Sequence, residues 1–131
     1  MKIRIKRFDK ELSLPRAHSR GAAAFDLCAR ERVEIFPRAV GYVPLNIAVE
    51  TPPGYFLLVA ARSSTHKRGL LPVHGIGIGD PDFSGDEDEY KAPYYNFTDA
   101  PVVVERGDRI AQGLFVKREE VEWEEGEMLG H

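Results

Sequence analysis

The sequence contains a single cysteine, Cys28, among its 131 residues. One thiol can form neither an intrachain disulfide nor a cysteine-based zinc site, which excludes disulfide-stabilised secreted domains and zinc fingers. Also absent is any apolar run near the roughly 18–20 residues that span a bilayer. Residues 2–6 alternate between charged and apolar side chains and lack the apolar stretch of a signal peptide. We therefore expect a soluble, cytoplasmic protein that has no membrane partner.

An excess of positive charge is absent as well. The chain has 18 Lys and Arg against 21 Asp and Glu, which gives a net charge of −3. Proteins that bind a nucleic-acid backbone are normally basic, so we expect no nucleic-acid partner. The 43% hydrophobic content is enough to build a core. This length fits one domain, which we expect to span residues 1–131.

No segment shows a convincing helical spacing of apolar residues, whereas alternation of apolar and polar residues is frequent. This period of two predicts half-buried strands at residues 2–6, 32–35, 43–49 and 102–104. Residues 55–61 are apolar throughout and indicate a strand covered on both faces, although a short buried helix stays open. Pro52-Pro53-Gly54 and Arg106-Gly107-Asp108 predict turns. The sequence is thus typical of an all-β barrel or a jelly-roll-like sandwich.

Two short polar segments interrupt the first half of this pattern. In residues 21–27, Asp26 stands alone among small and apolar neighbours. A buried acid needs a partner, so we expect an arginine or a metal-bound water beside it, unless it caps a turn. The second segment, Arg62-Ser63-Ser64, follows the most apolar strand. A guanidinium and two hydroxyls suit phosphate oxygens, but a Ser/Thr turn with a surface arginine is an alternative interpretation.

A third segment, residues 75–85, combines alternating glycines with two acids and an aromatic residue. The glycines would let a ligand lie against the backbone, and a carboxylate there can activate a water or hold a cation. Spacing of oxygen side chains from Asp80 onward also partly matches a calcium-binding EF-hand loop. The last position of such a loop must be glutamate, and here it is Lys91. Strand-like flanks further weaken the calcium interpretation.

The order of these segments resembles the five-motif pattern of the trimeric dUTP pyrophosphatase (dUTPase) family. Residues 21–27 are similar to its first motif, Arg62-Ser63-Ser64 to the second, residues 77–85 to the third and residues 107–112 to the fourth. Together they extend over most of the chain. The resemblance implies a distorted jelly-roll (β-clip) barrel that assembles as a homotrimer, with active sites shared between subunits.

The resemblance further implies hydrolysis of dUTP to dUMP and pyrophosphate with Mg²⁺ as cofactor. Asp80 would be the catalytic base that activates the water attacking the α-phosphorus. Phe83 would lie under the deoxyribose, and Asp26 and Arg109 would support the site from behind. Mg²⁺ would be held mainly by the triphosphate, with a water-mediated contact to Asp26 as an option, and by no direct protein ligand. The substrate-binding residues would be Arg62, Ser63, Ser64, His74, Gly75, Gly77, Ile78, Asp82, Phe83 and Gln112.

Several departures from the family pattern keep two alternatives open. Phe83 stands where tyrosine is usual, and the acidic segment 85–91 is longer than the common pattern. Asp80-Pro81 is similar to the related dCTP deaminases, so a deaminase or a bifunctional deaminase–pyrophosphatase is one alternative, with Glu89 as proton shuttle. A non-catalytic, nucleotide-binding regulatory protein is the other. The arginine- and glycine-rich fifth motif is absent from residues 119–131. We expect it beyond His131, and loss of the motif from this protein is the alternative interpretation.

Overall fold

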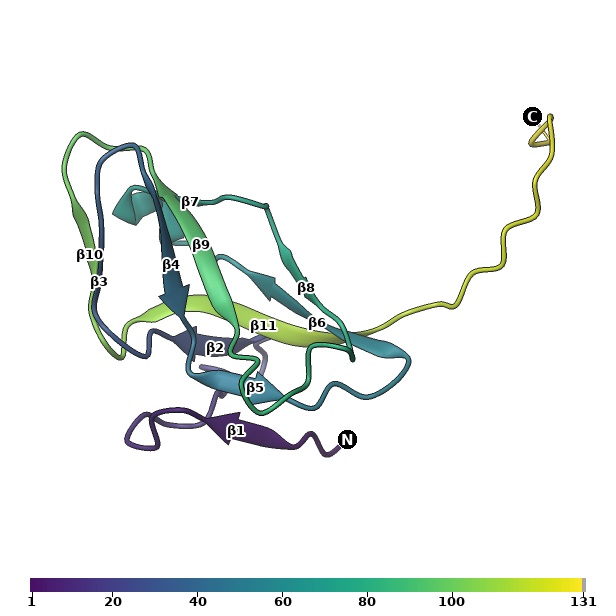
Figure 1. Cartoon of the computed structure of the whole chain (residues 1–131), viewed down its shortest axis with the longest axis horizontal. Helices are drawn as coiled ribbons and strands as arrows, with labels where there is room; N and C mark the ends of the chain where they lie inside the picture. The colour runs from purple at the N-terminus through teal and green to yellow at the C-terminus, as the bar shows by residue number, and fades with distance from the viewer. Residues whose placement is uncertain (131) are drawn as a thin grey trace.

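The computed structural model describes residues 1–130 and consists of short strands, turns and one 3-10 helix (Figure 1). His131 lies outside the described residues. The elements are β1 (Ile5–Arg7), β2 (Phe25–Cys28), β3 (Val33–Ile35), β4 (Val40–Pro44), β5 (Ile47–Val49), β6 (Tyr55–Ala60), η1 (Thr65–Arg68), β7 (Leu70–Pro72), β8 (Gly77–Gly79), β9 (Lys91–Asn96), β10 (Val102–Val104) and β11 (Arg109–Lys117). The expected all-β class is confirmed.

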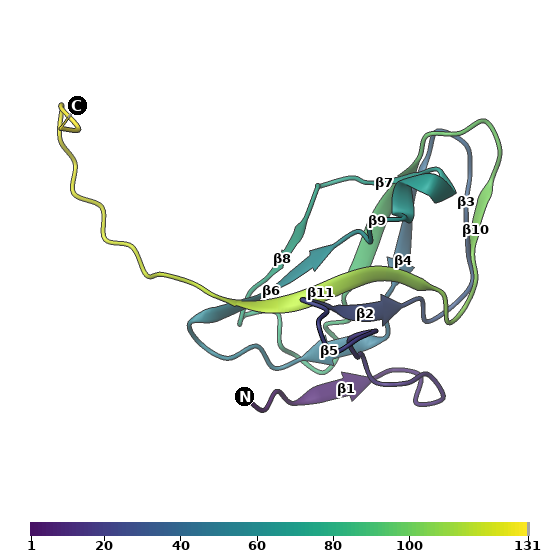
Figure 2. The same cartoon turned by 180° about the vertical axis from the view of Figure 1, so that it is seen from behind.

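The strands form four antiparallel sheets. A four-stranded sheet has the order β2-β11-β6-β8, and a three-stranded sheet has the order β4-β9-β7. Two further pairs, β1-β5 and β10-β3, flank them. The long strand β11 crosses the molecule in both views (Figures 1 and 2). Because it pairs with β2 on one side and β6 on the other, β11 brings together segments that are far apart in the sequence.

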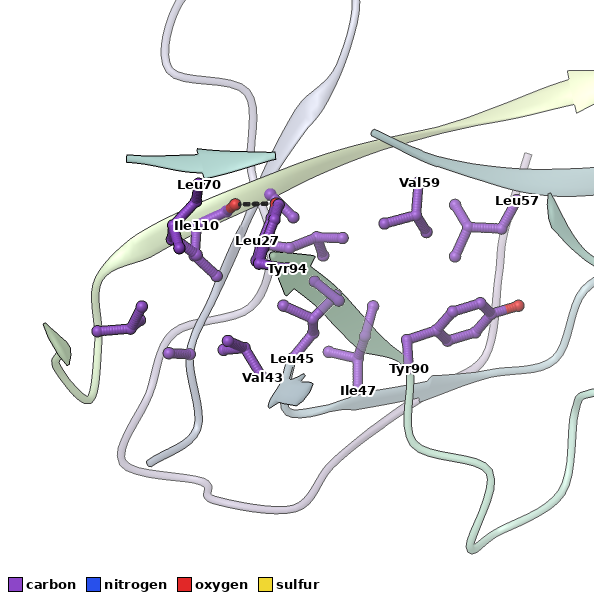
Figure 3. Packing of buried hydrophobic residues seen from close by; sticks show 14 of the residues in the cluster. Leu27, Val43, Leu45, Ile47, Leu57, Val59, Leu70, Tyr90, Tyr94 and Ile110 are labelled. Atoms are coloured by element: carbon purple, nitrogen blue, oxygen red, sulfur yellow. Dashed lines mark hydrogen bonds between the residues drawn. The ribbon is translucent and has the colours of Figure 1, made fainter. Parts of the chain in front are cut away.

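Apolar side chains from most strands meet in one buried cluster (Figure 3). Its largest fully buried apolar members are Tyr94, Leu27, Ile35, Leu45, Ile47, Leu57, Leu70, Ile110, Val43 and Val104. The Tyr94 hydroxyl donates a hydrogen bond to the carbonyl of Ile110, which satisfies the only polar group of that side chain. In residues 1–130, no helix is both long and apolar enough to cross a membrane.

The expectation of one continuous strand at residues 43–49 is wrong. All four of its alternating apolar residues are buried, but the chain divides into β4 and β5 at Asn46, whose φ is +72°. Asparagine tolerates this left-handed conformation better than most residues. Its buried side chain also accepts a hydrogen bond from the Asp9 amide at 2.6 Å and donates one to the Asp9 carbonyl at 3.0 Å. The alternation of apolar and polar residues therefore continues across Asn46, and it does not predict the bend there.

The strand expected at residues 55–61 is present as β6, so the helical alternative is wrong. Only Leu57 and Val59 are fully buried in it, so the strand is less covered on its second face than an entirely apolar run suggests. Both expected turns are confirmed. The Tyr55 amide donates to the Pro52 carbonyl beside Gly54, and the Asp108 amide donates to the Glu105 carbonyl around Gly107. Gly54 and Gly107 have φ values of +83° and +89°, which favour glycine.

Candidate active site

Three segments that are distant in sequence meet at one end of β11. Asp26 on β2 lies opposite Gln112 on β11, and Gln112 lies opposite Ala60 at the end of β6. This pairing carries Arg62, just beyond β6, to the Asp26 carboxylate, where Arg62 Nε lies 3.2 Å from Asp26 Oδ1. Arg109, at the start of β11, places its Nη1 3.9 Å from Asp26 Oδ2. Asp26 thus has the arginine partner that its sequence context predicts. We call Asp26, Arg62, Ser63, Ser64, Arg109 and Gln112 the cationic end.

The loop that carries Arg62 is fixed by hydrogen bonds. The Thr65 hydroxyl accepts a bond from the Arg62 amide at 3.0 Å, and the Thr65 amide donates to the Arg62 carbonyl at 3.1 Å. Gln112 Nε2 donates to the Ala61 carbonyl at 3.0 Å. Ser63 and Ser64, between these anchors, are exposed to solvent. The hydroxyls are therefore presented by a loop whose two ends are held in place.

Charge at the cationic end favours an anionic ligand. Two guanidinium groups face one carboxylate, so the three side chains carry a net positive charge. The Asp26 side chain is only 13% exposed, while those of Arg62 and Arg109 are 31% and 62% exposed. The carboxylate can orient both arginines, and Arg62 Nη1 also donates a hydrogen bond to the Arg109 carbonyl at 3.2 Å. Guanidinium groups and hydroxyls together form a suitable site for phosphate oxygens.

The third segment forms a separate cleft. Strand β8 pairs with β6, and Asp80 follows it directly in a turn in which the Phe83 amide donates to the Asp80 carbonyl at 3.0 Å. Asp80, His74, Gly77, Ile78 and Phe83 line a cavity of about 610 Å³. The Asp80 residue is exposed, so its carboxylate is accessible to a bound molecule. We call this cavity the glycine-strand cleft.

Not every residue of the sequence prediction lines this cleft. Gly75, with a φ of +76°, forms the turn before β8, and exposed Asp82 lies outside the cleft lining. Conversely, the cleft has lining residues that sequence reasoning missed, foremost Tyr90. The rings of Tyr90 and Phe83 meet edge to face, with 5.0 Å between their centroids and 81° between their planes. An aromatic residue after an acidic run gave no sequence signal for such a position.

Glu89, the alternative proton shuttle, lines the glycine-strand cleft, but its carboxylate is held in an ion pair with Arg30. Its carboxylate accepts hydrogen bonds from Arg30 Nε at 2.7 Å, Arg30 Nη2 at 3.1 Å and the Asn46 amide at 2.9 Å. The Glu89 side chain is 8% exposed, and the ion pair raises the pKa of Arg30. A carboxylate with both oxygens occupied by strong donors is poorly suited to carry protons to a base. The geometry therefore gives the deaminase interpretation no support.

Metal-binding geometry is limited. Within the described chain, residues 1–130, no three His, Cys, Asp or Glu side chains gather as metal ligands. In the segment that resembles an EF-hand, Asp88 Oδ2 instead accepts a hydrogen bond from the Gly85 amide at 2.9 Å. The calcium interpretation thus has no support. Asp26 is paired with Arg62 and Arg109, so it fits only a water-mediated contact to a Mg²⁺ ion held mainly by phosphate oxygens.

The cationic end and Asp80 lie at opposite ends of β6. Gly79 pairs with Leu57 near the beginning of β6, whereas Arg62 follows the end of that strand. Leu57 and Arg62 are five positions apart in the sequence, which corresponds to roughly 16 Å between their Cα atoms along an extended chain. Asp80 and Arg62 of the same chain therefore do not meet directly at one end of the sheet.

Comparison with known proteins gives consistent results. The family model described as dUTPase matches residues 10–130. The deoxyuridine 5′-triphosphate nucleotidohydrolase of Dictyoglomus turgidum is 35% identical over 98% of this chain and 89% of its own length, and that of Corynebacterium glutamicum is 40% identical over 97% and 85%. The crystal structure of the dUTPase from Streptococcus mutans superposes with a TM-score of 0.82 at 29% identity, covering 91% of this chain and 98% of that one. The distorted jelly-roll fold follows from this superposition.

Proposed function

Because the chain belongs to the dUTPase family, we propose that it hydrolyses dUTP to dUMP and pyrophosphate. The observation that carries the proposal is the meeting of Asp26, Arg62 and Arg109 at one positively charged end of the four-stranded sheet. These residues come from three of the family's four motifs found here. The substrate's triphosphate is the chemical group that such a cluster suits best. We propose that residues 1–131 act as one catalytic domain.

Asp80 is the proposed general base. It would accept a proton from the water that attacks the α-phosphorus, and the bond from that phosphorus to the bridging oxygen of the pyrophosphate would break. Arg62, the Ser63 and Ser64 hydroxyls and Gln112 would hold the phosphate chain. Asp26 and Arg109 would orient these phosphate-binding side chains. Phosphoryl transfer depends mainly on positioning and charge stabilisation, which these residue types supply.

Uracil would lie in the glycine-strand cleft, with the backbone at Gly75, Gly77 and Ile78 close to its edge. His74, at the mouth of the cleft, and Asp82 complete the proposed contacts. Phe83 would support the deoxyribose. Phe83 is 38% exposed and so is available for such a contact. Mg²⁺, held mainly by the triphosphate and through water by Asp26, would neutralise charge on the phosphate oxygens.

The active site is proposed to form between subunits of a homotrimer. The location of Asp80 and Arg62 at opposite ends of β6 supports this, because the two groups do not meet within one chain. A second copy that contributes its Asp80 would complete the site at the cationic end of the first. Cyclic assembly repeats this contact around the ring and leaves no site unpaired.

An exposed apolar face supports the oligomer. On the β4-β9-β7 sheet, Val40 lies opposite Tyr95, which lies opposite Leu71, so the three side chains share one face. Tyr42, two residues along β4, shares that face and is 64% exposed. Val40 and Leu71 are 45% and 46% exposed. Contiguous apolar surface of this kind is typical of a protein contact, and a second copy of this chain is the partner we propose.

The decisive experiment incubates the protein with each of the four common deoxynucleoside triphosphates and with dUTP in the presence of Mg²⁺. Pyrophosphate and ammonia are assayed together. We expect pyrophosphate from dUTP and no ammonia from dCTP. Ammonia from dCTP would support the deaminase alternative, and binding of dUTP without pyrophosphate would support the regulatory one. Cytoplasmic location stays a prediction from the sequence.

A further inference from the structure

Tyr90 stands out because its bulky side chain is buried next to the proposed reaction centre although the proposed mechanism does not use it. The residue is 7% exposed and precedes β9. Its backbone is fixed on both sides, since its amide donates to the Ile47 carbonyl at 3.0 Å and its carbonyl accepts from the Leu45 amide at 2.8 Å. The ring lies at the edge of the buried cluster, and its hydroxyl points away from Ile47 and Tyr94 (Figure 3). Tyr90 is thus a rigid wall of the glycine-strand cleft.

The space that the Tyr90 ring occupies exists only because residue 79 is glycine. A Cβ atom added to Gly79 would lie 1.9 Å from Tyr90 Oη and 2.6 Å from Tyr90 Cζ. Neither distance is sterically possible, so any side chain at position 79 would displace the ring. Glycine within a strand commonly marks such a close approach. Gly79 directly precedes Asp80, so the ring is packed against the backbone that carries the proposed base.

On its other side the Tyr90 ring packs against the Phe83 ring. The two aromatic rings meet edge to face with a 5.0 Å separation, which is a favourable geometry for an aromatic pair. The following residue is also anchored, because the Thr51 amide donates to Ser84 Oγ at 3.1 Å. Phe83 is otherwise a partly exposed residue in a turn. The contact with Tyr90 therefore restricts the position of the Phe83 ring.

The hydroxyl of Tyr90 does not explain its presence. Tyr90 Oη and the nearby Thr51 Oγ1 are both buried, and neither has a hydrogen-bond partner of good geometry among residues 1–130. Burial raises the pKa of the Tyr90 phenol, so the group stays neutral. A buried hydroxyl without a partner costs free energy and does not stabilise the fold. The structural contribution of the Tyr90 side chain is its ring, which packs between Gly79 and Phe83.

From these contacts we infer that Tyr90 is a positioning residue for discrimination of the sugar: it fixes the Phe83 ring where it contacts a 2′-deoxyribose and obstructs a 2′-hydroxyl. The inference rests on the proposed function, because it assigns a role to Phe83 in dUTP binding. It adds a residue outside the motifs that the sequence predicted. Tyr90 acts through Phe83 and touches no reacting atom.

The test compares kcat/KM for dUTP with that for UTP. Replacing the ring by a flexible aliphatic side chain in Tyr90→Leu should lower the dUTP-to-UTP ratio on the order of tenfold to a hundredfold, the range by which pockets discriminate single hydroxyls. Tyr90→Phe keeps the ring and should keep the ratio. Gly79→Ala should lower the ratio as Tyr90→Leu does, and the double variant should be no worse than Tyr90→Leu, since both act through one ring.

A matched control separates positioning from loss of stability. Leu70 is fully buried and lies at the opposite end of the cluster from Tyr90 (Figure 3). Leu70→Ala should lower the melting temperature without changing the dUTP-to-UTP ratio. An unchanged ratio in a folded Tyr90→Leu variant, a lowered ratio in Tyr90→Phe, or an equal loss in Leu70→Ala would overturn the inference. If Tyr90→Leu does not fold, Gly79→Ala decides by the same criterion. Failure of the wild type to release pyrophosphate from dUTP would overturn the proposed function and this inference together.

Discussion

Asp26 on β2 and Arg62, just beyond β6, form an ion pair in which Asp26 Oδ1 lies 3.2 Å from Arg62 Nε. The two strands do not pair with each other, since β11 lies between them. The ion pair therefore depends on correct registration of β11 with both neighbours. It fixes the orientation of the guanidinium group before any ligand is present. An oriented arginine loses less conformational freedom when it binds a phosphate.

Arg62→Lys should weaken binding of dUTP although it keeps the charge. Lysine lacks the planar fork that hydrogen-bonds Asp26 and a phosphate at once. Loss of a hydrogen bond to a charged group costs about 1.5–3 kcal/mol, so KM should rise on the order of 10- to 100-fold. Steady-state kinetics measure this change. Arg38→Lys, at the exposed ion pair with Asp99, is the control and should leave KM unchanged. An unaltered KM in Arg62→Lys would remove Arg62 from the phosphate site.

Asp80→Asn should lower kcat on the order of 10²- to 10⁴-fold, which is the usual effect of removing a general base. The amide keeps the size of the carboxylate, so binding of a non-hydrolysable dUTP analogue should persist. Pyrophosphate release and calorimetric titration give the two values. Asp99→Asn serves as control, because the Asp99 side chain is 94% exposed and belongs to the surface pair with Arg38. Near-normal turnover by Asp80→Asn would show that another group activates the water.

Mixing two inactive variants tests whether the site is shared between subunits. Asp80→Asn keeps the cationic end, and Arg62→Ala keeps Asp80. When the two chains are refolded together, random assembly should give about one quarter of the sites with both intact residues. Activity should therefore return to about a quarter of the wild-type value in this mixture, and each variant refolded alone gives the baseline. No recovery in oligomers that demonstrably contain both chains would mean that each site is built from one chain.

Glu89→Ala should destabilise the protein without changing the reaction. The substitution leaves Arg30, whose side chain is 32% exposed, and the Asn46 amide without their acceptor. Because Arg30 can regain some water, we expect a loss of about 2 kcal/mol, less than for a fully buried pair. Urea denaturation measures it. Glu50→Ala, at an exposed pair with Arg4, should cost less than about 0.5 kcal/mol. Equal stability of the two variants would contradict a structural role for Glu89.

Stability should fall at alkaline pH partly through Tyr94. Burial raises the pKa of Tyr94 to about 12, whereas an unfolded tyrosine ionises near 10. The folded state therefore retains a proton that the unfolded state loses, so this contribution is complete below pH 10 and disappears as the pH rises toward 12. The expected loss is on the order of 2 kcal/mol. Denaturation from pH 8 to 12 should show a steeper decline for the wild type than for Tyr94→Phe. Parallel curves would disprove the contribution.

The class of fold and the family could be predicted from the sequence alone. Alternation at Val33–Ile35 and Val102–Val104, and the turns around Gly54 and Gly107, predicted elements that the structure contains. These predictions succeed because side-chain alternation and turn geometry are local properties of the chain. The order of four motifs was enough to indicate the family. Local pattern failed at Asn46, where a side-chain contact with the distant Asp9 accompanies a bend in an otherwise regular alternation.

Which residues contact one another could not be predicted without the three-dimensional structure. Alternation shows which face of a strand is buried, but not which strand lies beside it, because pairing depends on contacts between distant segments. The sequence could therefore list Asp26, Arg62 and Asp80 as candidates without showing that the first two meet and the third lies at the other end of β6. Nor could it show that Tyr90 fills the space left by Gly79. That relationship depends on packing between β8 and the residue that precedes β9, and packing is fixed only when the whole core is assembled.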